Sequence, residues 1–203
     1  PLYVATRERN VRVVQIDATL PFSSQATGVS VVNSGADGFA LPMFWLSPAN
    51  VIRSTKLIAT DLQRLYPEQA EQIRANEQAI TSALLADKAE AEAQLLQVAD
   101  PFVYALADEF DYVTNEFGIF VDGYFIKQDL DWTEEDLANL SQHLQDWDIP
   151  VVIHKWEPSD AIKQAIADGG AELVILDTYE TASTSLQDLS MGNINKLLAA
   201  LAE

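Results

Sequence analysis

Two consecutive stretches of the chain carry apolar residues at the three- and four-residue spacing of an amphipathic helix. The first follows Ser47, which can cap a helix whose first turn holds Pro48, and this helix is expected to stop near Pro67. The second begins at Pro67 and extends to near Val98, with helix-favouring Ala, Glu and Gln between its apolar positions. The apolar anchors are Val51, Ile52, Ile58, Leu62 and Leu65 in the first helix, and Ile73, Ile80, Leu84, Leu95 and Leu96 in the second. The pattern therefore predicts two helices in succession, the second of them long.

The chain beyond residue 100 alternates short apolar runs with helical segments. Thr133 and Asp136 resemble a capping box, Ser159 can cap the next helix, and Gly118 can end an earlier one. The predicted strands lie at 101–106, 119–126, 150–154 and 173–176, and the predicted helices at 108–117, 133–144, 159–167 and 191–201. Because helices separate the strands, we predict an α/β three-layer domain with a largely parallel sheet, preceded by the long helix.

The N-terminal part of the chain is expected to contain two strands separated by loops. Val11–Ile16 is typical of a β-strand, but Pro1–Asn10 holds no convincing first element of an independent domain, so the chain is expected to begin in the middle of a fold. The turn-rich stretch Pro21–Gly28 precedes a second apolar run at Val29–Val32, which we also predict to be a strand, and a loop follows at Asn33–Gly38.

The charge balance excludes some partners. The chain holds 31 acidic and 12 basic residues, a net charge of −19, so no sequence-independent binding to nucleic acid or to an anionic membrane is expected. Basic partners and cations stay open, as does the simpler interpretation that the charge serves solubility. The absence of Cys excludes disulfides, thiolate metal sites and Cys nucleophiles, but it fits an exported protein as well as a cytosolic one.

Direct membrane insertion is not expected. No apolar run approaches the roughly 20 residues that a membrane-spanning helix needs. The N-terminus also lacks the basic flank and apolar core of a signal peptide. If the protein is exported, its targeting segment is expected to lie outside this sequence.

Catalytic motifs are missing as well. The sequence has no P-loop, no dinucleotide-binding glycine motif and no nucleophile elbow, which disfavours an NTPase, a dehydrogenase and an α/β-hydrolase. Acidic pairs such as Asp129 with Asp131 are interpreted as structural rather than catalytic. His143 and His154 belong to no metal-binding spacing and are interpreted as polar surface or hydrogen-bonded side chains. Trp156 could meet a ligand at the edge of a crevice. We therefore expect a protein that is not an enzyme.

The stretch Pro42–Asn50 gives the most specific indication of function. It reads Pro-Met-Phe-Trp-Leu-Ser-Pro-Ala-Asn and resembles the segment Asp-Pro-His-x-Trp-Leu-(Asp/Ser)-Pro-x-Asn of the substrate-binding proteins of zinc and manganese ABC transporters. Further segments resemble that family in the same order, namely Tyr66–Ala70 with Arg74–Asn76, Asp108–Tyr112 with Phe117–Gly118, Leu176–Asp177, and Met191–Leu197. The chain is thus similar to the metal-type ABC substrate-binding proteins, and its elements from Val11 onward follow the later two-thirds of that family.

The resemblance implies a partial helical-backbone, metal-receptor-like fold, because the family's N-terminal lobe would precede Pro1. Residues 1–66 would be a remnant of that lobe and the segment leading into the linker, residues 67–98 the long linking helix, and residues 99–203 the C-terminal α/β lobe. The resemblance also implies a non-enzymatic extracytoplasmic component, periplasmic or anchored at the cell surface. Such a component captures a metal ion between two lobes and docks on an ABC permease. Without the missing lobe, a homodimer could cover the apolar surface left exposed.

The family's metal-ligand positions are mostly lost within this span. Met43 stands in place of a His, Ala107 in place of a His or Glu, and Asp177 alone keeps an oxygen ligand. A single carboxylate cannot hold Zn²⁺ or Mn²⁺ tightly, and a thioether is a soft ligand suited to Cu(I). The metal site is therefore predicted to be degenerate, with Zn²⁺ or Mn²⁺ bound weakly or, as the favoured expectation, not bound by this chain alone. Asp108 and Glu109 follow the lost ligand, but as neighbours on a predicted helix they point about 100° apart.

Two other functions stay open. A protein-interaction or scaffold module that keeps the fold without binding metal is the main alternative, and the lack of ligands converging with Asp177 favours it. An enzyme that acts through the region of Asp108, Glu109 and His154 is a more distant one. The sequence does not decide which ligand or ion is bound.

Overall fold

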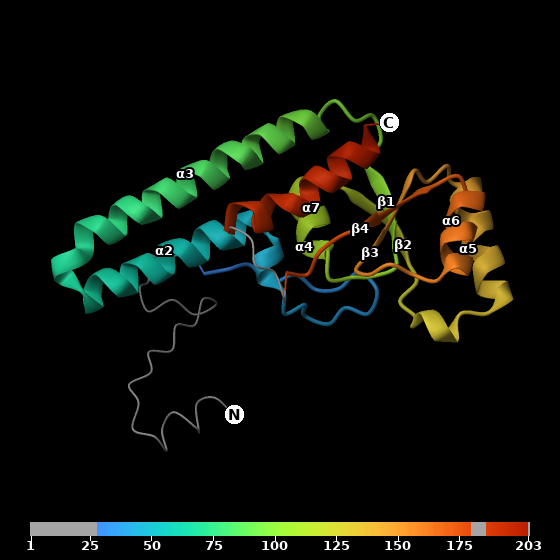
Figure 1. Cartoon of the computed structure of the whole chain (residues 1–203), viewed down its shortest axis with the longest axis horizontal. Coiled ribbons are helices and arrows are strands. Elements are labelled where there is room, and N and C mark those ends of the chain that lie inside the picture. Colours follow the sequence, from blue (N-terminus) through green and yellow to red (C-terminus); the bar gives the residue numbers. More distant parts are fainter. Residues whose placement is uncertain (1–27, 180–185, 203) are drawn as a thin grey trace, which may run out of the picture.

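The computed structural model describes residues 28–179 and 186–202, so the strand predicted at Val11–Ile16 lies outside the described residues. The helices are α2 (Pro48–Leu65), α3 (Ala70–Leu95), α4 (Asp111–Phe117), α5 (Glu134–Asp146), α6 (Asp160–Asp168) and α7 (Leu186–Leu201). Short 3₁₀ turns are η1 (Phe44–Leu46), η2 (Pro67–Gln69) and η3 (Asp129–Asp131). The strands are β1 (Phe102–Ala105), β2 (Phe120–Tyr124), β3 (Val151–His154) and β4 (Glu172–Ile175). Figure 1 shows α2 and α3 as a pair of long helices that extends to one side of the sheet.

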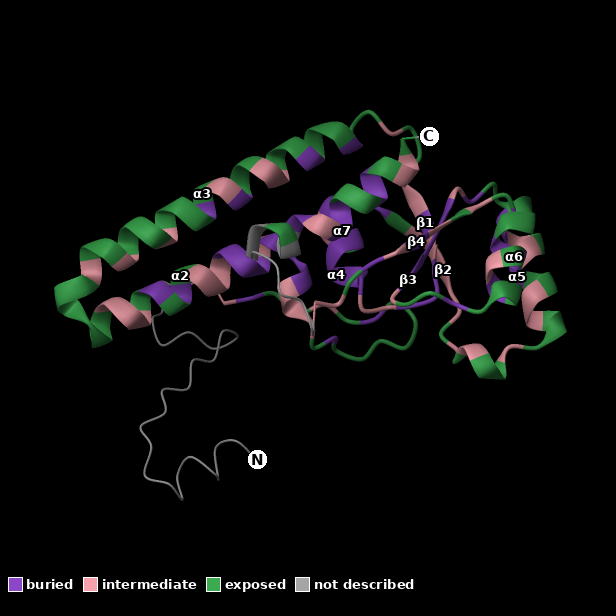
Figure 2. Cartoon of the chain, viewed as in Figure 1, coloured by how far each residue is buried: buried purple, intermediate pink, exposed green. Residues whose placement is uncertain are grey.

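The four strands form one sheet in the order β2-β1-β3-β4, and each neighbouring pair is parallel. Because successive side chains of a strand point to opposite faces, Val103 and Ala105 of β1 join a core with α4 and α7, whereas Tyr104 joins a core with α5 and α6. All residues of the central strand β3 are buried, as expected for a strand covered by helices on both faces. Figure 2 shows this burial along the sheet and the inner sides of its helices. The predicted α/β three-layer fold with a parallel sheet is confirmed.

Helix α3 connects the helical pair to the sheet. Leu84, near its middle, is fully buried against Val51 and Ile52 of α2. Towards its C-terminal end, Ala91 and Leu95 enter the core that α7 forms with the sheet. One helix therefore packs first against α2 and then against α7, while most of its remaining surface is exposed (Figure 2).

The capping signals of the sequence act where they are predicted. The Ser47 hydroxyl accepts a hydrogen bond from the backbone N–H of Asn50 at 3.1 Å and starts α2. Thr133 and Asp136 form the complete capping box at the start of α5. Gly118 ends α4 with φ at 69°, in the left-handed region that glycine adopts without strain. Local side-chain chemistry therefore sets these three helix ends.

The prediction of a strand at Val29–Val32 was wrong. The backbone N–H of Ser30 donates to Asn50 Oδ1 at 2.8 Å, and the N–H of Val32 donates to the Tyr112 hydroxyl at 3.3 Å. Side chains of α2 and α4 thus accept the hydrogen bonds that a neighbouring strand would accept if this run were part of a sheet. The Val32 carbonyl also accepts a hydrogen bond from the N–H of Leu41 at 2.9 Å, next to an isolated antiparallel bridge between Asn33 and Ala40, but the run does not join the four-stranded sheet.

Helix α4 begins at Asp111 and not at Asp108 as predicted. Residues 108–110 form a turn, in which the N–H of Asp111 donates to the carbonyl of Asp108 at 3.1 Å. Asp108 and Glu109 would point about 100° apart if both lay on a helix. This spacing does not apply, because both precede α4. Two other helix starts also differ from the prediction: α3 begins at Ala70 after the turn η2, and α7 begins earlier than predicted, at Leu186.

The helices of residues 28–179 and 186–202 include none with the length and apolar character needed to cross a membrane.

Candidate functional site

The carboxyl ends of the four parallel strands meet at one edge of the sheet. From β1 the chain passes through α4 to β2 on one side, and from β3 through α6 to β4 on the other. The β1–β3 pair is therefore a topological switch point, where open α/β sheets commonly bind ligands. We call the loops that follow β1, β3 and β4, residues 106–110, 155–159 and 176–179, the carboxyl edge.

Asp177 lies at the carboxyl edge with its side chain exposed, on a loop that α7 anchors. Asn193, which is 2% exposed, accepts a hydrogen bond from the Asp177 N–H at 2.8 Å and donates one to the Asp177 carbonyl at 2.8 Å. The Trp45 indole donates to the Thr178 carbonyl at 2.9 Å. Asp177 Oδ1 accepts from the N–H of Tyr179 at 2.7 Å, and burial, followed by the Asp177 charge, raises the pKa of Tyr179 to about 12. The carboxylate is thus presented from a firmly held backbone.

The other two predicted ligand positions hold apolar side chains. Met43 is half-buried just before η1 and packs against the core beneath the sheet edge. Ala107 is 1% exposed in the same core and offers no ligand atom on its side chain. Across residues 28–179 and 186–202, no group of three or more His, Cys, Asp or Glu side chains could hold a metal ion. Of the three predicted ligand positions, only Asp177 carries an oxygen ligand on its side chain.

An ion pair joins the ends of β1 and β3 at the switch point. Glu109 Oε1 and Lys155 Nζ are hydrogen-bonded, and their side chains are only 14% and 27% exposed. The second carboxylate oxygen, Glu109 Oε2, is buried and has no hydrogen-bond partner. Lys155 Nζ also lies 4.8 Å from the centre of the Trp156 ring, which adds a cation–π contact. We call the contact between Glu109 and Lys155 the edge ion pair.

The edge ion pair was missed because Glu109 was placed on a helix. Two signals in the sequence could have found it. Lys155 directly follows a buried strand, where a charged side chain must reach the carboxyl edge, and Glu109 lies two residues after the position of a lost ligand.

Asp111 is a second carboxylate that the sequence did not single out. It is 1% exposed, and its oxygens accept hydrogen bonds from the N–H of Gly35 at 2.7 Å and from the Tyr124 hydroxyl at 3.0 Å. Burial raises the pKa of Asp111, and the charges of Asp108 and Glu109 raise it further, although the two hydrogen bonds act in the opposite direction. Asp111 thereby fastens the loop that carries Gly35 to the start of α4.

Both histidines are interpreted from the sequence as polar surface or hydrogen-bonded side chains; the surface alternative is wrong for His154, whereas His143 fits the interpretation. His154 is 2% exposed, its Nδ1 has no hydrogen-bond partner, and its Nε2 lies 3.7 Å from Asp129 Oδ1. Burial lowers the pKa of His154, and Asp129 opposes this effect. Asp129 also accepts a hydrogen bond from the Trp156 indole at 3.2 Å. His143 is a partly exposed residue whose Nε2 lies 2.6 Å from Asp122 Oδ2.

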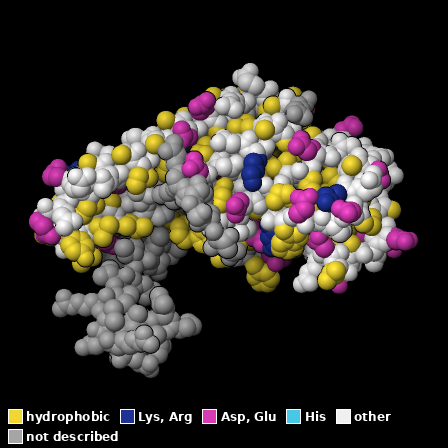
Figure 3. Space-filling model, in the orientation of Figure 1, with side chains coloured by type: hydrophobic (Ala, Val, Ile, Leu, Met, Phe, Trp, Pro, Cys, Tyr) yellow, Lys and Arg dark blue, Asp and Glu magenta, His cyan; other side chains and the backbone are white. Residues whose placement is uncertain are grey.

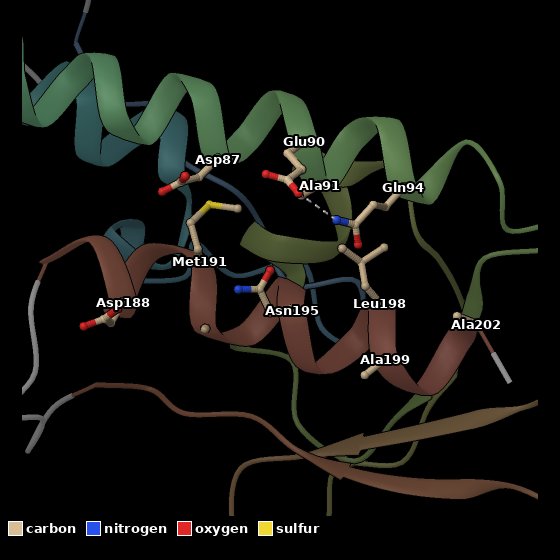
Figure 4. Close-up of a pocket in the computed structure, with 11 residues that line it drawn as sticks. Asp87, Glu90, Ala91, Gln94, Asp188, Met191, Asn195, Leu198, Ala199 and Ala202 are labelled. Carbon is tan, nitrogen blue, oxygen red and sulfur yellow. Dashed lines mark hydrogen bonds between the residues drawn. The ribbon is translucent and has the colours of Figure 1, made fainter.

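The structure also has a cavity that no residue of the carboxyl edge lines. It has a volume of about 750 Å³ between α3 and α7, and Figure 4 shows Asp87, Glu90 and Gln94 of α3 opposite Met191 and Asn195 of α7. Gln94 donates a hydrogen bond to Glu90 at 3.4 Å. None of the three predicted ligand positions lines this cavity. The candidate site therefore remains the carboxyl edge.

Comparisons with known proteins agree with the observed fold. A sequence model of the ZnuA family, described as zinc-uptake complex component A, periplasmic, matches residues 8–203. No curated protein sequence matches the chain significantly. Among solved structures, a mutant of FpvC from Pseudomonas aeruginosa aligns with a TM-score of 0.72 at 21% identity, over 86% of this chain and 68% of that chain.

Two further structures have similar scores. The Zn(II)-bound ZnuA-like domain of AdcA from Streptococcus pneumoniae aligns with a TM-score of 0.69 at 18% identity, over 85% of this chain and 68% of that chain. A metal-free mutant of the periplasmic metal binding protein of Candidatus Liberibacter asiaticus gives 0.66 at 14% identity, over 87% and 69%.

The fold shared with these structures is that of substrate-binding proteins. Since the family model covers nearly the whole length of the sequence, the chain belongs to the ZnuA family of periplasmic zinc-uptake components.

Proposed function

We propose that the chain is a non-enzymatic substrate-binding component of a metal-uptake ABC transporter, with a degenerate metal site at the carboxyl edge. The observation that carries this proposal is the placement of Asp177. It is the one predicted ligand position with an oxygen ligand, and Asn193 fixes its backbone with two hydrogen bonds of 2.8 Å. Membership of the ZnuA family supports the same conclusion.

The proposal assigns a role to each part of the chain. Residues 67–98, which include α3, form the linking helix, and residues 99–203 form the C-terminal lobe. Residues 1–66 belong to the N-terminal lobe and the segment leading into the linker. The protein works outside the cytoplasm, and its partner is an ABC permease, which the family description as a periplasmic uptake component supports.

The metal ion is the cargo, and we propose that this chain holds it weakly. Asp177 supplies one oxygen ligand, while the side chains of Met43 and Ala107 are apolar and packed into the core. Zn²⁺ takes four ligands and Mn²⁺ commonly more, so a single carboxylate leaves most positions to water. A second lobe would have to supply further ligands for tight binding.

Titration of the chelator-stripped chain with Zn²⁺ and with Mn²⁺ tests this function. We expect a dissociation constant weaker than about 1 μM, which corresponds to less than about 8 kcal/mol of binding free energy. Asp177→Ala is expected to abolish the remaining heat. The matched control is Glu68→Ala, which removes an exposed carboxylate from η2, far along the chain from the carboxyl edge, and should leave binding unchanged. Equal binding by the wild-type chain and Asp177→Ala would contradict the proposed role of Asp177.

A protein-interaction module that keeps the fold without metal is the second candidate. Large apolar side chains are exposed near the end of α2, where Ile58 is 43%, Leu65 49% and Tyr66 49% exposed. Ile58 and Leu65 are seven residues apart and so share one face of the helix. Figure 3 shows hydrophobic side chains gathered over this end of the α2–α3 pair. Such a face favours a partner that covers it, and we propose a second copy of the chain.

Light scattering tests the homodimer. We expect the mass of a dimer for the wild-type chain and a shift towards the monomer for Leu65→Glu, because a charge on the apolar face cannot be buried without a partner. Leu130→Glu, at a side chain that is 96% exposed on η3, should leave the mass unchanged. A folded wild-type chain that stays monomeric at high concentration would exclude this candidate.

A further inference from the structure

The loop after β1 carries a cluster of acidic groups, and one of them, Glu109, pairs with a lysine. Asp108 and Glu109 lie in the turn before α4, and Asp111 begins the helix. The three carboxylates influence one another, since the charges of Asp108 and Glu109 raise the pKa of Asp111 beyond the effect of burial. Lys155 comes from the end of the adjacent strand β3 and pairs with Glu109. A positive charge is therefore supplied by the chain itself at the switch point.

The edge ion pair is built into the structure rather than lying free on the surface. Its two side chains are 14% and 27% exposed, and the Trp156 ring lies 4.8 Å from the ammonium nitrogen. Charged groups with so little exposure to water need a partner, because burying an unpaired charge is costly in free energy. Yet only one oxygen of the Glu109 carboxylate is used, and Oε2 is buried without a hydrogen-bond partner. The carboxylate thus has one buried acceptor that no hydrogen bond uses.

We propose that Lys155 is a tethered cation that occupies Glu109 and closes the carboxyl edge to divalent metal ions. A carboxylate two residues after Ala107 can serve a divalent ion as an oxygen ligand, but the ammonium group already holds one of its oxygens. The Lys155 ammonium group and a divalent ion at the same carboxylate would repel each other. The repulsion is strong where little water intervenes. The chain belongs to a metal-uptake family and yet offers few metal ligands. The proposal explains this difference, because a lysine takes the place of the ion. This inference rests on the proposed function only in naming a divalent cation as the cargo.

Titration of Lys155→Gln with Mn²⁺ and Zn²⁺ tests the proposal. The amide can still donate a hydrogen bond to Glu109, but it carries no charge. We expect the affinity for at least one of the two ions to rise at least about tenfold over wild type, because the like charge has been removed. The double variant Lys155→Gln/Glu109→Gln should lose this gain. Lys163→Gln is the matched control, since it breaks an ion pair on α6 with Asp160 and Glu157 and should leave the affinity unchanged.

Two further variants keep the test decisive. Lys155→Met retains the length of the side chain and its packing on Trp156, and it replaces Lys155→Gln if that variant does not fold by circular dichroism. Lys155→Arg keeps the charge and should bind metal no better than wild type. A folded neutral variant without a gain, or a gain that survives Glu109→Gln, would overturn the proposal. These results are independent of the Asp177→Ala comparison, which tests the proposed function in the presence of Lys155.

Discussion

Leu84→Ala is expected to lower the free energy of unfolding by about 2–5 kcal/mol, the range for a large aliphatic side chain removed from a core. Leu84 is fully buried on α3 and contacts Val51 and Ile52 of α2. The substitution leaves a cavity between the two helices that the neighbouring side chains fill only in part. Urea denaturation followed by circular dichroism measures the change, and we expect one cooperative transition at a lower midpoint.

The adjacent position supplies the control for this experiment. Leu85 lies one residue further along α3 and is 52% exposed, so Leu85→Ala should change the free energy of unfolding by less than about 1 kcal/mol. A small effect of Leu84→Ala, or a separate early transition, would mean that the α2–α3 pair unfolds apart from the sheet. That outcome would contradict the continuous packing of α3 from α2 to α7.

The sequence predicts the elements whose signals are local. Ser47 and the pair Thr133 with Asp136 start their helices, because a cap needs only a side chain within three residues of the backbone group it bonds. Gly118 ends α4 for a similarly local reason. The alternation of strands and helices then requires parallel strands with helical crossovers. The three-layer fold follows from these signals without any long-range information.

The failures involve contacts between residues far apart in the sequence. Val29–Val32 has the composition of a strand, but Asn50 and Tyr112 accept from the N–H groups of Ser30 and Val32, and both belong to helices that follow later in the chain. The start of α4 depends on a turn at 108–110 that no strong cap announces. In both places the tertiary contacts override the local preference of the chain.

The candidate site was predicted only as far as the family resemblance extends. That resemblance places Met43, Ala107 and Asp177, but it contains no information on what replaces a lost ligand. The pairing of Glu109 with Lys155 joins residues from the ends of two neighbouring strands, so it depends on the order of the strands in the sheet. Strand order is a property of the whole fold and cannot be obtained from either segment alone.

Asn193→Ala is expected to cost about 2–4 kcal/mol of unfolding free energy, since it removes two hydrogen bonds and leaves a backbone N–H and a carbonyl without partners. Asn193 is 2% exposed and binds both backbone groups of Asp177 at 2.8 Å. Its loss should also loosen the loop that receives the Trp45 indole at Thr178. Urea denaturation measures the stability. The fluorescence of Trp45, obtained by subtracting the spectrum of the same protein with Trp45→Phe, reports on the loop.

Asn195→Ala separates this effect from a general weakening of α7. Asn195 lies two residues further along the same helix and is exposed, so its replacement by Ala should change the stability by less than about 0.5 kcal/mol. If Asn193→Ala were equally mild, the backbone of Asp177 would have to be held by other contacts. If it is costly while the fold persists, Asn193 is what keeps the backbone of Asp177 in place. A buried side chain that fixes this carboxylate would then support the proposed weak cation binding over a scaffold that has no use for Asp177.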